Sequence, residues 1–300
     1  MKMKHKLQGT LFLLLATIIW GSAFVSQSVG MDHIGPFTFQ AARCLLAVLI
    51  LIPLIFLFDI SQGQGKQFVK KWANAKLWKA GILCGIPLFL ACNLQQVGLV
   101  DTDAGKSGFL TAMYIVIVPV ISIFLKKKIT IMIPISVILA VAGLYCLSCI
   151  GVTEISTGDL LTLGCALMFA VQITFVDIFA HGMDALRINT IQSLVCAVLS
   201  GIVVIFAETP TWQGILDCAL PLAHTGILSM GIAYSLQILG QQKLESTIAS
   251  LLMSLESVFA VIFSTWLLGE TMTIWETIGC ILVFTAVILS QIPVKAKTSA

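Results

Sequence analysis

The stretch SLLMSLESVFAVIFSTWLL, Ser250–Leu268, is apolar or small at every position except Glu256. It has about the length that a helix needs to cross the hydrocarbon core of a bilayer, roughly 20 residues. Glu256 lies 11 residues after Glu245, which places it about 16 Å along such a helix at a rise of about 1.5 Å per residue. The stretch therefore predicts a membrane helix that carries an ionisable side chain near the middle of the bilayer.

The composition of the whole chain agrees with a membrane protein. Of the 300 residues, 58% are hydrophobic and 10% are charged, whereas a soluble domain carries about 25% charged residues. The 17 basic and 14 acidic side chains are too few to cover a water-facing surface. Disorder is excluded because the chain is far too apolar. We therefore expect an all-α integral membrane protein with a multi-pass topology.

Ten apolar runs along the chain are long enough to cross a bilayer as helices. They are, approximately, Leu7–Val29, Phe37–Phe58, Leu77–Val100, Gly105–Leu125, Ile129–Ile150, Asp159–Ala180, Ile188–Ala207, Cys218–Gly240, Thr247–Leu268 and Thr273–Ile292. Two of these runs contain a proline well inside the span, Pro87 and Pro119, where we expect a bend because proline frees a backbone carbonyl.

The distribution of basic residues predicts the orientation of these ten helices. A cytoplasmic N-terminus places 15 of the 17 basic residues on the inner side, leaving Lys106 outside and Arg43 within a span. The 15 are Lys2, Lys4, Lys6, Lys66, Lys70, Lys71, Lys76, Lys79, Lys126, Lys127, Lys128, Arg187, Lys243, Lys295 and Lys297. An excess of lysine and arginine marks the cytoplasmic loops of a membrane protein. We expect both termini to be cytoplasmic, in a bacterial inner membrane.

The two halves of the chain, residues 1–153 and 154–300, resemble each other weakly. Gly108–Leu125 and Ala249–Leu268 hold the same place in their halves, and each precedes a short polar turn and another apolar run. Because five spans is an odd number, the second half enters the membrane from the opposite side. The pattern predicts two inverted five-helix repeats, an architecture common in secondary transporters.

Three stretches carry a resemblance to a known family. They are NLQQVGLVDTDAGKSGFLTAMYIVIVP (Asn93–Pro119), GIAYSLQILGQQ (Gly231–Gln242) and SLESVFAVIFSTWLLGE (Ser254–Glu270). The chain resembles the drug/metabolite transporter superfamily, specifically its EamA-type members. The resemblance implies a ten-helix carrier of inverted-repeat build, and many members export metabolites. Many relatives have proline directly after the glutamate, where this chain has Ser257, so we expect this span to be straighter here.

Polar and aromatic residues within the spans are candidates for a transport pathway. A polar group at membrane depth needs a partner, which either a neighbouring helix or a polar cavity supplies. Taken together, the set favours a cavity for a small zwitterionic or polar organic solute, although for each residue alone an interhelical hydrogen bond is an equal alternative. The candidates are Trp20, Ser22, Asn93, Gln96, Thr111, Tyr114, Gln172, Tyr234, Gln237 and Glu256.

Two ionisable residues within spans are candidates for charge coupling. Glu256 is costly in the bilayer interior and should face a pathway, where it could bind and release a proton during transport. The alternative is a structural glutamate that hydrogen-bonds a neighbouring helix. Arg43 could pair with Glu256, contact an anionic substrate, or extend its side chain to the membrane interface, and we favour the last interpretation.

No cofactor, metal or nucleic-acid partner is expected from the sequence. The nine cysteines are scattered through apolar runs without zinc-ligand spacing, so we interpret them as small buried hydrophobes. The segment Gly105–Ser107 resembles the end of a nucleotide-binding loop, but Val100 occupies the position that requires glycine. Transport would therefore be driven by a proton gradient or by substrate exchange rather than by ATP.

These observations predict a secondary transporter, an exporter of small metabolites or of amino-acid-like or drug-like solutes that works by alternating access. Two alternatives remain at this stage. An intramembrane enzyme would need a nucleophile with a base, or a metal cluster, and the four histidines are too widely spread to provide one. A passive pore would show repeated filter residues. We therefore do not expect an enzyme.

Overall fold

The computed structural model describes residues 2–102, 104–127, 129–148, 155–268 and 272–292, and within them it contains helices and no strand. The all-α prediction is confirmed. The elements are α1 (Lys2–Met31), α2 (Pro36–Ser61), η1 (Gly65–Gln67), α3 (Phe68–Trp72), α4 (Ala75–Gly98), α5 (Ala104–Ala112), α6 (Tyr114–Phe124), α7 (Met132–Ser148), α8 (Thr157–Phe179), α9 (Ala185–Ala207), α10 (Trp212–Asp217), α11 (Ala219–Ala223), η2 (His224–Ala233), α12 (Tyr234–Gln241), α13 (Ser246–Met253), α14 (Leu255–Leu268) and α15 (Ile274–Ser290).

Eight helical segments are long and apolar enough to cross a membrane. They are Lys4–Met31, Pro36–Ser61, Ala75–Gly98, Lys106–Phe124, Thr157–Phe179, Ala185–Ala207, Ala219–Gln241 and Ser246–Phe263. Two further predicted runs, Ile129–Ile150 and Thr273–Ile292, form α7 and α15, which are apolar but only 17 residues long each. Eight of the ten predicted spans therefore meet the length requirement, and crossing by α7 and α15 stays a prediction.

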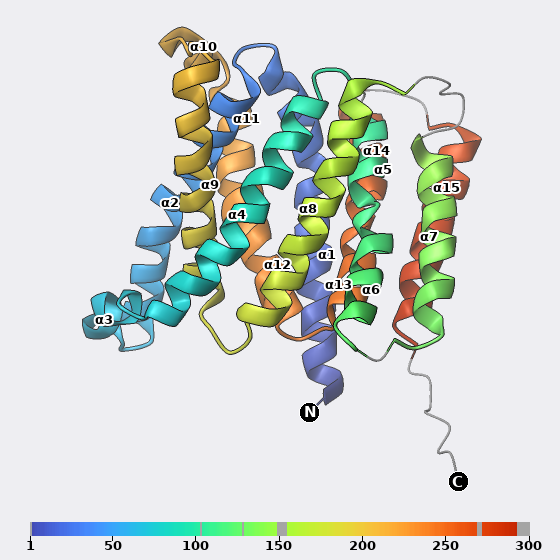
Figure 1. Cartoon of the computed structure of the whole chain (residues 1–300), viewed down its shortest axis with the longest axis horizontal. Helices are drawn as coiled ribbons and strands as arrows, with labels where there is room; N and C mark the ends of the chain where they lie inside the picture. Colours follow the sequence, from blue (N-terminus) through green and yellow to red (C-terminus); the bar gives the residue numbers. More distant parts are fainter. Residues whose placement is uncertain (1, 103, 128, 149–154, 269–271, 293–300) are drawn as a thin grey trace.

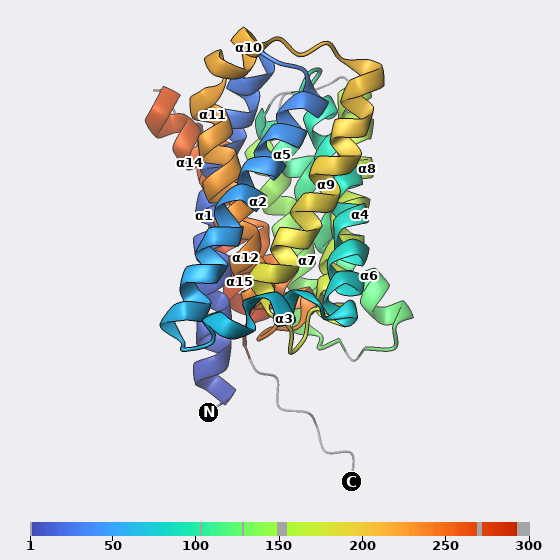
Figure 2. The same ribbon diagram turned by 90° about the vertical axis from the view of Figure 1, so that its left-hand side faces the viewer.

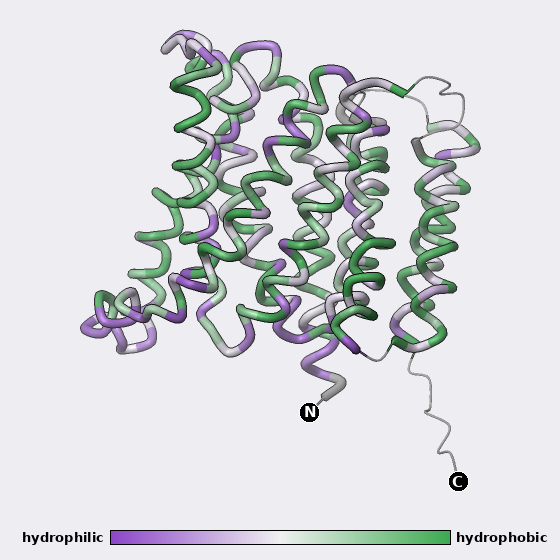
Figure 3. The backbone as a smooth tube through the Cα atoms, viewed as in Figure 1, coloured by the Kyte–Doolittle hydropathy of each residue, from purple (hydrophilic) through white to green (hydrophobic). Residues whose placement is uncertain are grey.

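The long helices run side by side as a bundle with polar residues concentrated toward its two ends (Figures 1 and 3). Helix α1 begins at the same end at which α15 stops, and the short helix α3 lies there too, beside the bundle (Figures 1 and 2). Helix α10 lies at the opposite end. We call these the α1 end and the α10 end of the molecule.

Three pairs of helices approach closely because glycines face each other. In each pair, a Cβ atom added to one glycine would lie within 3.1 Å of the carbonyl oxygen of the other. The pairs are Gly9 with Gly240 (α1 and α12), Gly98 with Gly158 (α4 and α8), and Gly143 with Gly279 (α7 and α15). Small residues of this kind let membrane helices pack backbone to backbone.

Some of the residues on which the sequence predictions rest lie outside the part of the chain that the structure describes. The repeat boundary at residues 153 and 154 lies outside the described residues, as do Lys128, Lys295 and Lys297. Helix α4 continues through Pro87 and α6 continues through Pro119, and a bend at either proline stays a prediction.

Candidate functional site

The fourth and ninth predicted spans are each interrupted near their middle. Helices α5 and α6 meet at Met113, and helices α13 and α14 meet at Ser254. At both points the backbone makes tighter three-residue turns: Val116 N donates to Met113 O over 3.0 Å, and Ser257 N donates to Ser254 O over 3.2 Å. Interrupted membrane helices are frequent at transporter binding sites, because they free backbone groups and leave a deformable point.

The ninth span is interrupted at Ser254 although this chain has no proline there, and whether the span is straighter than in relatives stays a prediction. Ser254 Oγ donates to Leu251 O over 2.8 Å, and serine bonds of this type bend helices. Ser257, the residue that replaces the proline of many relatives, instead donates from its hydroxyl to Gly108 O of α5 over 3.0 Å. The serine thereby ties one interrupted helix to the other.

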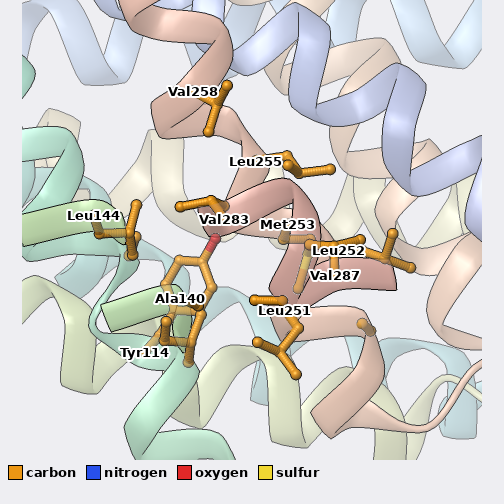
Figure 4. Close-up of a cluster of buried hydrophobic side chains, with 14 of the residues drawn as sticks. Tyr114, Ala140, Leu144, Leu251, Leu252, Met253, Leu255, Val258, Val283 and Val287 are labelled. Carbon is orange, nitrogen blue, oxygen red and sulfur yellow. The ribbon is translucent and has the colours of Figure 1, made fainter. Parts of the chain in front are cut away.

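The two interrupted helices also meet through Tyr114 and Glu256. Tyr114 begins α6 and donates from its hydroxyl to Glu256 Oε1 over 3.0 Å. Figure 4 shows the tyrosine ring in an apolar cluster, with its hydroxyl directed toward the segment that carries Met253 and Leu255. Glu256 itself is 7% exposed. The hydrogen bond from Tyr114 therefore gives the buried Glu256 carboxyl group a polar partner.

A central cavity opens beside this contact. Its volume is about 40 Å³, which is room for a few water molecules and far below the roughly 300–1,000 Å³ of small-molecule sites. An organic solute therefore requires the lining side chains to move. The lining residues are Trp20, Phe24, Gln27, Arg43, Gln95, Thr111, Tyr114, Phe169, Ile173, Ser229, Tyr234, Gln237, Met253 and Glu256.

The structure brings most of the sequence-predicted candidates together in this cavity. Those that line it are Trp20, Arg43, Thr111, Tyr114, Tyr234, Gln237 and Glu256. The rings of Trp20 and Tyr234 form one wall in edge-to-face contact, with their centroids 5.0 Å apart. These residues come from helices far apart in the sequence, so the shared cavity is a tertiary property.

Four candidates lie away from this cavity and bond to neighbouring helices, which is the alternative that the sequence left open. Ser22 Oγ lies 3.2 Å from His224 Nε2, and Asn93 Nδ2 donates to Ser200 Oγ over 2.9 Å. Gln96 Nε2 lies 3.4 Å from the carbonyl oxygen of Gln27. Gln172 donates to Gln192 and accepts a hydrogen bond from Gln237 over 3.0 Å, so it supports a lining residue from behind.

Arg43 does not reach the membrane interface, because its side chain lies inside the protein and is only 2% exposed. This corrects the interpretation that we favoured from the sequence. Its Nε donates to Gln40 Oε1 over 2.7 Å, and its Nη1 donates to Gln27 Oε1 over 2.5 Å. Among the described carboxylates none forms an ion pair with it. The cavity therefore contains a guanidinium held only by neutral partners.

Two polar atoms at the cavity have no hydrogen-bond partner among the described residues. They are the indole nitrogen of Trp20 and the amide oxygen of Gln237, and both are buried. A buried polar group without a partner costs free energy, and each such group calls for an explanation such as a polar ligand or water. A donor and an acceptor are therefore available in the cavity for a bound solute.

Seven lining residues were not predicted, and one pattern in the sequence could have shown two of them. Trp20, Phe24 and Gln27 follow one face of α1 at spacings of four and three residues. On α4, Gln95 lines the cavity and its neighbour Gln96 does not. The sequence gives no signal that distinguishes the two glutamines. The remaining ones, Phe169, Ile173, Ser229 and Met253, are ordinary core-type or small residues.

The residues near the cavity offer little for a metal. Within the described part of the chain, no group of three His, Cys, Asp or Glu residues could hold a metal ion. Cys44 of α2 and Cys196 of α9 each accept a hydrogen bond from Gln40 Nε2 over 3.1 Å. The two buried thiols therefore serve as polar contacts between these helices.

The chain is similar to known transporters over most of its length. The model of the EamA-like transporter family matches the chain twice, over residues 7–149 and 156–291. A protein of Archaeoglobus fulgidus named as an uncharacterized transporter is 31% identical over 295 residues, which are 96% of this chain and 87% of that protein. The uncharacterized transporter YoaV of Bacillus subtilis is 22% identical over 277 residues, covering 90% and 92% of the two chains.

A solved structure, titled only as the crystal structure of a protein, has the same fold. It superposes with a TM-score of 0.77 at 17% identity, covering 94% of this chain and 96% of the other. The two matches to the family model together extend over nearly the whole sequence and include every residue that lines the central cavity. This chain is a multi-pass membrane protein that belongs to the EamA-like transporter family.

Proposed function

We propose that the protein is a secondary transporter that exports small amino-acid-like or drug-like organic solutes by alternating access, without ATP. The observation that carries the proposal is the central cavity at the meeting point of two interrupted helices. It contains a buried guanidinium, a buried carboxyl group and two polar atoms that have no hydrogen-bond partner in the part of the chain that the structure describes. Such groups in the interior of a membrane protein mark a substrate pathway.

The chemistry of the cavity favours a zwitterionic solute with an apolar body. Arg43 can bind a carboxylate in the bidentate geometry that guanidinium groups favour, and its present partners are neutral amides that can be exchanged. The Glu256 carboxylate can bind an ammonium group. Between these two residues the lining is aromatic and apolar, with Trp20, Phe24 and Phe169 available to pack against a hydrophobic side chain.

Alternating access is commonly built on two similar halves of opposite orientation, and three features support this arrangement. The glycine contact between α1 and α12 has a counterpart between α4 and α8, as expected if the first and third helices of each half exchange roles. Helices α7 and α15, the last of each proposed half, contact each other. Both interrupted helices are the fourth of their half. We therefore propose two inverted five-helix repeats, which include α7 and α15 as membrane spans.

We propose further that the α1 end faces the cytoplasm of a bacterial cell, with both termini on that side. Helix α1 begins and α15 stops at this end, and α3 lies there (Figure 1). The lysines of α3 and those at the start of α1 therefore share one end of the bundle, and Lys106 begins the span at the other. This is the asymmetry that the positive-inside rule describes.

Glu256 is the proposed coupling residue. Its carboxyl group is buried, faces the cavity, and is hydrogen-bonded by the Tyr114 hydroxyl from the other interrupted helix. A change in its protonation alters that contact, and the contact joins the two interrupted helices whose movement relative to each other would open the cavity. The movement of the proton and the movement of the substrate would then both depend on the contact between Tyr114 and Glu256.

The first test is a search for ligands of the purified protein. Thermal unfolding of the detergent-solubilised protein is measured against amino acids, amines, purines and cationic dyes. A ligand at about 100 times its dissociation constant stabilises the native state by about 2.7 kcal/mol. We expect zwitterionic amino acids with apolar side chains to raise the melting temperature, and Arg43→Gln to remove the rise. A rise with cationic dyes alone would contradict the proposed substrate class.

Transport itself is tested with a hit compound in proteoliposomes. A carrier shows saturable uptake and counterflow, in which unlabelled solute on one side drives labelled solute inward from the other. Flux that is linear in concentration and without counterflow would indicate a passive pore. Recovery of a covalently altered compound would indicate an enzyme.

A further inference from the structure

A lysine-rich segment at the α1 end is not used by the proposed transport mechanism. Residues 60–100 contain five lysines and no aspartate or glutamate. The lysines cluster between Lys66 and Lys79, on the η1–α3 segment and the first turn of α4. Figure 1 shows α3 beside the bundle at the level where the long helices end, and Figure 3 shows hydrophilic residues along this segment.

The segment is docked on the bundle through the buried side chain of Arg187. The Arg187 guanidinium lies 5.8 Å from the ring centroid of Phe68 and 5.5 Å from that of Trp72. It also forms ion pairs with Asp59 at the end of α2 and with Asp184 at the start of α9. The short helix α3 is therefore held in a defined position against α2 and α9.

One of the five lysines is used in this docking, and the other four face outward. Lys71 turns inward, where its ammonium group lies 2.6 Å from Asp59 Oδ1 and 2.6 Å from Gln64 Oε1. We call the other four the lysine patch. They are exposed and form no ion pair with a described carboxylate, and they are Lys66, Lys70, Lys76 and Lys79.

Apolar side chains accompany the patch on the outward face. Val69 is 77% exposed and Trp78 is 38% exposed. The Trp78 indole N–H donates to the carbonyl oxygen of Trp72 over 2.8 Å, which fixes the ring at the level of α3. Tryptophan is enriched where a membrane meets water, and apolar residues among lysines are typical of segments that lie in the interface.

We infer that the lysine patch is a binding site for anionic phospholipid headgroups of the surrounding leaflet. The argument is charge complementarity at a fixed place: four uncompensated ammonium groups lie beside the bundle at headgroup level, and neighbouring apolar side chains can contact acyl chains. Each lysine near an anionic membrane surface strengthens binding by about fivefold. Because α3 packs on Arg187, bound lipid would also stabilise the joined ends of α2 and α9.

The test uses the full-length protein in non-ionic detergent micelles doped with either phosphatidylglycerol or phosphatidylcholine. The melting temperature is measured against the mole fraction of lipid. We expect phosphatidylglycerol to raise it and phosphatidylcholine to leave it unchanged. In the variant K66Q/K70Q/K76Q/K79Q, the phosphatidylglycerol needed for half the rise should increase by at least about tenfold.

A matched variant removes the same amount of charge elsewhere at this end of the molecule. K4Q/K6Q/K126Q/K243Q should respond to phosphatidylglycerol like the unchanged protein. An equal loss in both variants would show diffuse attraction and overturn the site, as would the absence of any phosphatidylglycerol effect. A rise with inorganic phosphate in lipid-free micelles would identify a phosphate site instead. The double variant K70Q/K79Q provides the same comparison if the quadruple variant does not fold.

Discussion

The two interrupted helices are similar in shape but are held in the molecule in different ways. The α5–α6 pair is fixed to α8 by an ion pair at each end, Lys106 with Asp159 and Lys127 with Asp177. The described residues of α13–α14 form no ion pair at all. Helix α14 is held instead by close packing on α1. It also carries Glu256.

This difference indicates that the two interrupted helices have different roles. A helix fixed by charges at both ends serves as a static wall of the cavity, whereas a helix held by apolar packing can slide or tilt with little loss of specific bonds. We infer that α13–α14 is the element that moves during transport and that α5–α6 stays with α8. The hydrogen bond from Tyr114 to Glu256 then joins the static helix to the moving one.

The largest expected effect on stability comes from disturbing the packing of α14 on α1. A Cβ atom added to Gly21 would lie 2.5 Å from Phe259 Cβ and 2.8 Å from the Phe259 carbonyl carbon. Such contact forces the helices apart, so we expect Gly21→Ala to lower the free energy of unfolding by about 1–3 kcal/mol. Transport should fall as well. Thermal unfolding and counterflow measure the two effects.

The same substitution at Gly201 of α9 is the control. No atom lies within 4 Å of a Cβ added there, and alanine is favoured over glycine within a helix by roughly 0.5–1 kcal/mol. We expect Gly201→Ala to be neutral or slightly stabilising. Equal losses from the two alanines would mean that the contact with Phe259 is not tight.

An effect of about the same size is expected from breaking the buried ion pair of the α5–α6 helix. The Asp159 side chain is 4% exposed and accepts hydrogen bonds from Lys106, over 2.5 Å, and from Thr102, over 3.0 Å. Asp159→Asn weakens both contacts and removes the negative charge of Asp159 from beside a partly buried ammonium group. We expect a loss of about 1–3 kcal/mol in the free energy of unfolding, measured by thermal denaturation. An unchanged melting temperature would argue against a static α5–α6.

The ion pair at the other end should matter least. The Lys127 side chain is 40% exposed, so solvent screens its pairing with Asp177. We expect Asp177→Asn to change the free energy of unfolding by about 0–1 kcal/mol, and high salt to remove the effect. A large, salt-independent loss would show that this pair is more than a surface contact.

The positions of the helices could be predicted from the sequence because run length and apolarity determine them. Eight long apolar helices lie where the hydrophobic runs predicted them, and the depth of Glu256 led directly to the cavity. The interruptions at Met113 and Ser254 could not be predicted, since neither position is a proline or a glycine. They depend on contacts between helices, such as the Ser257–Gly108 bond.

Which side of each helix faces the cavity was also only partly predictable. The apolar surroundings are similar on all sides of a membrane helix, so the rotation of α4 that selects Gln95 over Gln96 follows from its packing on α8. For Arg43, the length of the side chain allows either the interface or the interior. The amides of Gln27 and Gln40 decide the matter, because they offer acceptors inside the protein.

The central claim is that Glu256 changes protonation as the moving helix carries it through the transport cycle. The most direct measurement is the pH dependence of counterflow in proteoliposomes for the unchanged protein and for Glu256→Gln, with abundance and melting temperature as controls. Glutamine keeps an oxygen that can accept the Tyr114 hydrogen bond, so the fold should be retained. The account predicts that the variant still exchanges substrate but with a rate that no longer varies with pH. A pH profile identical to that of the unchanged protein would contradict it.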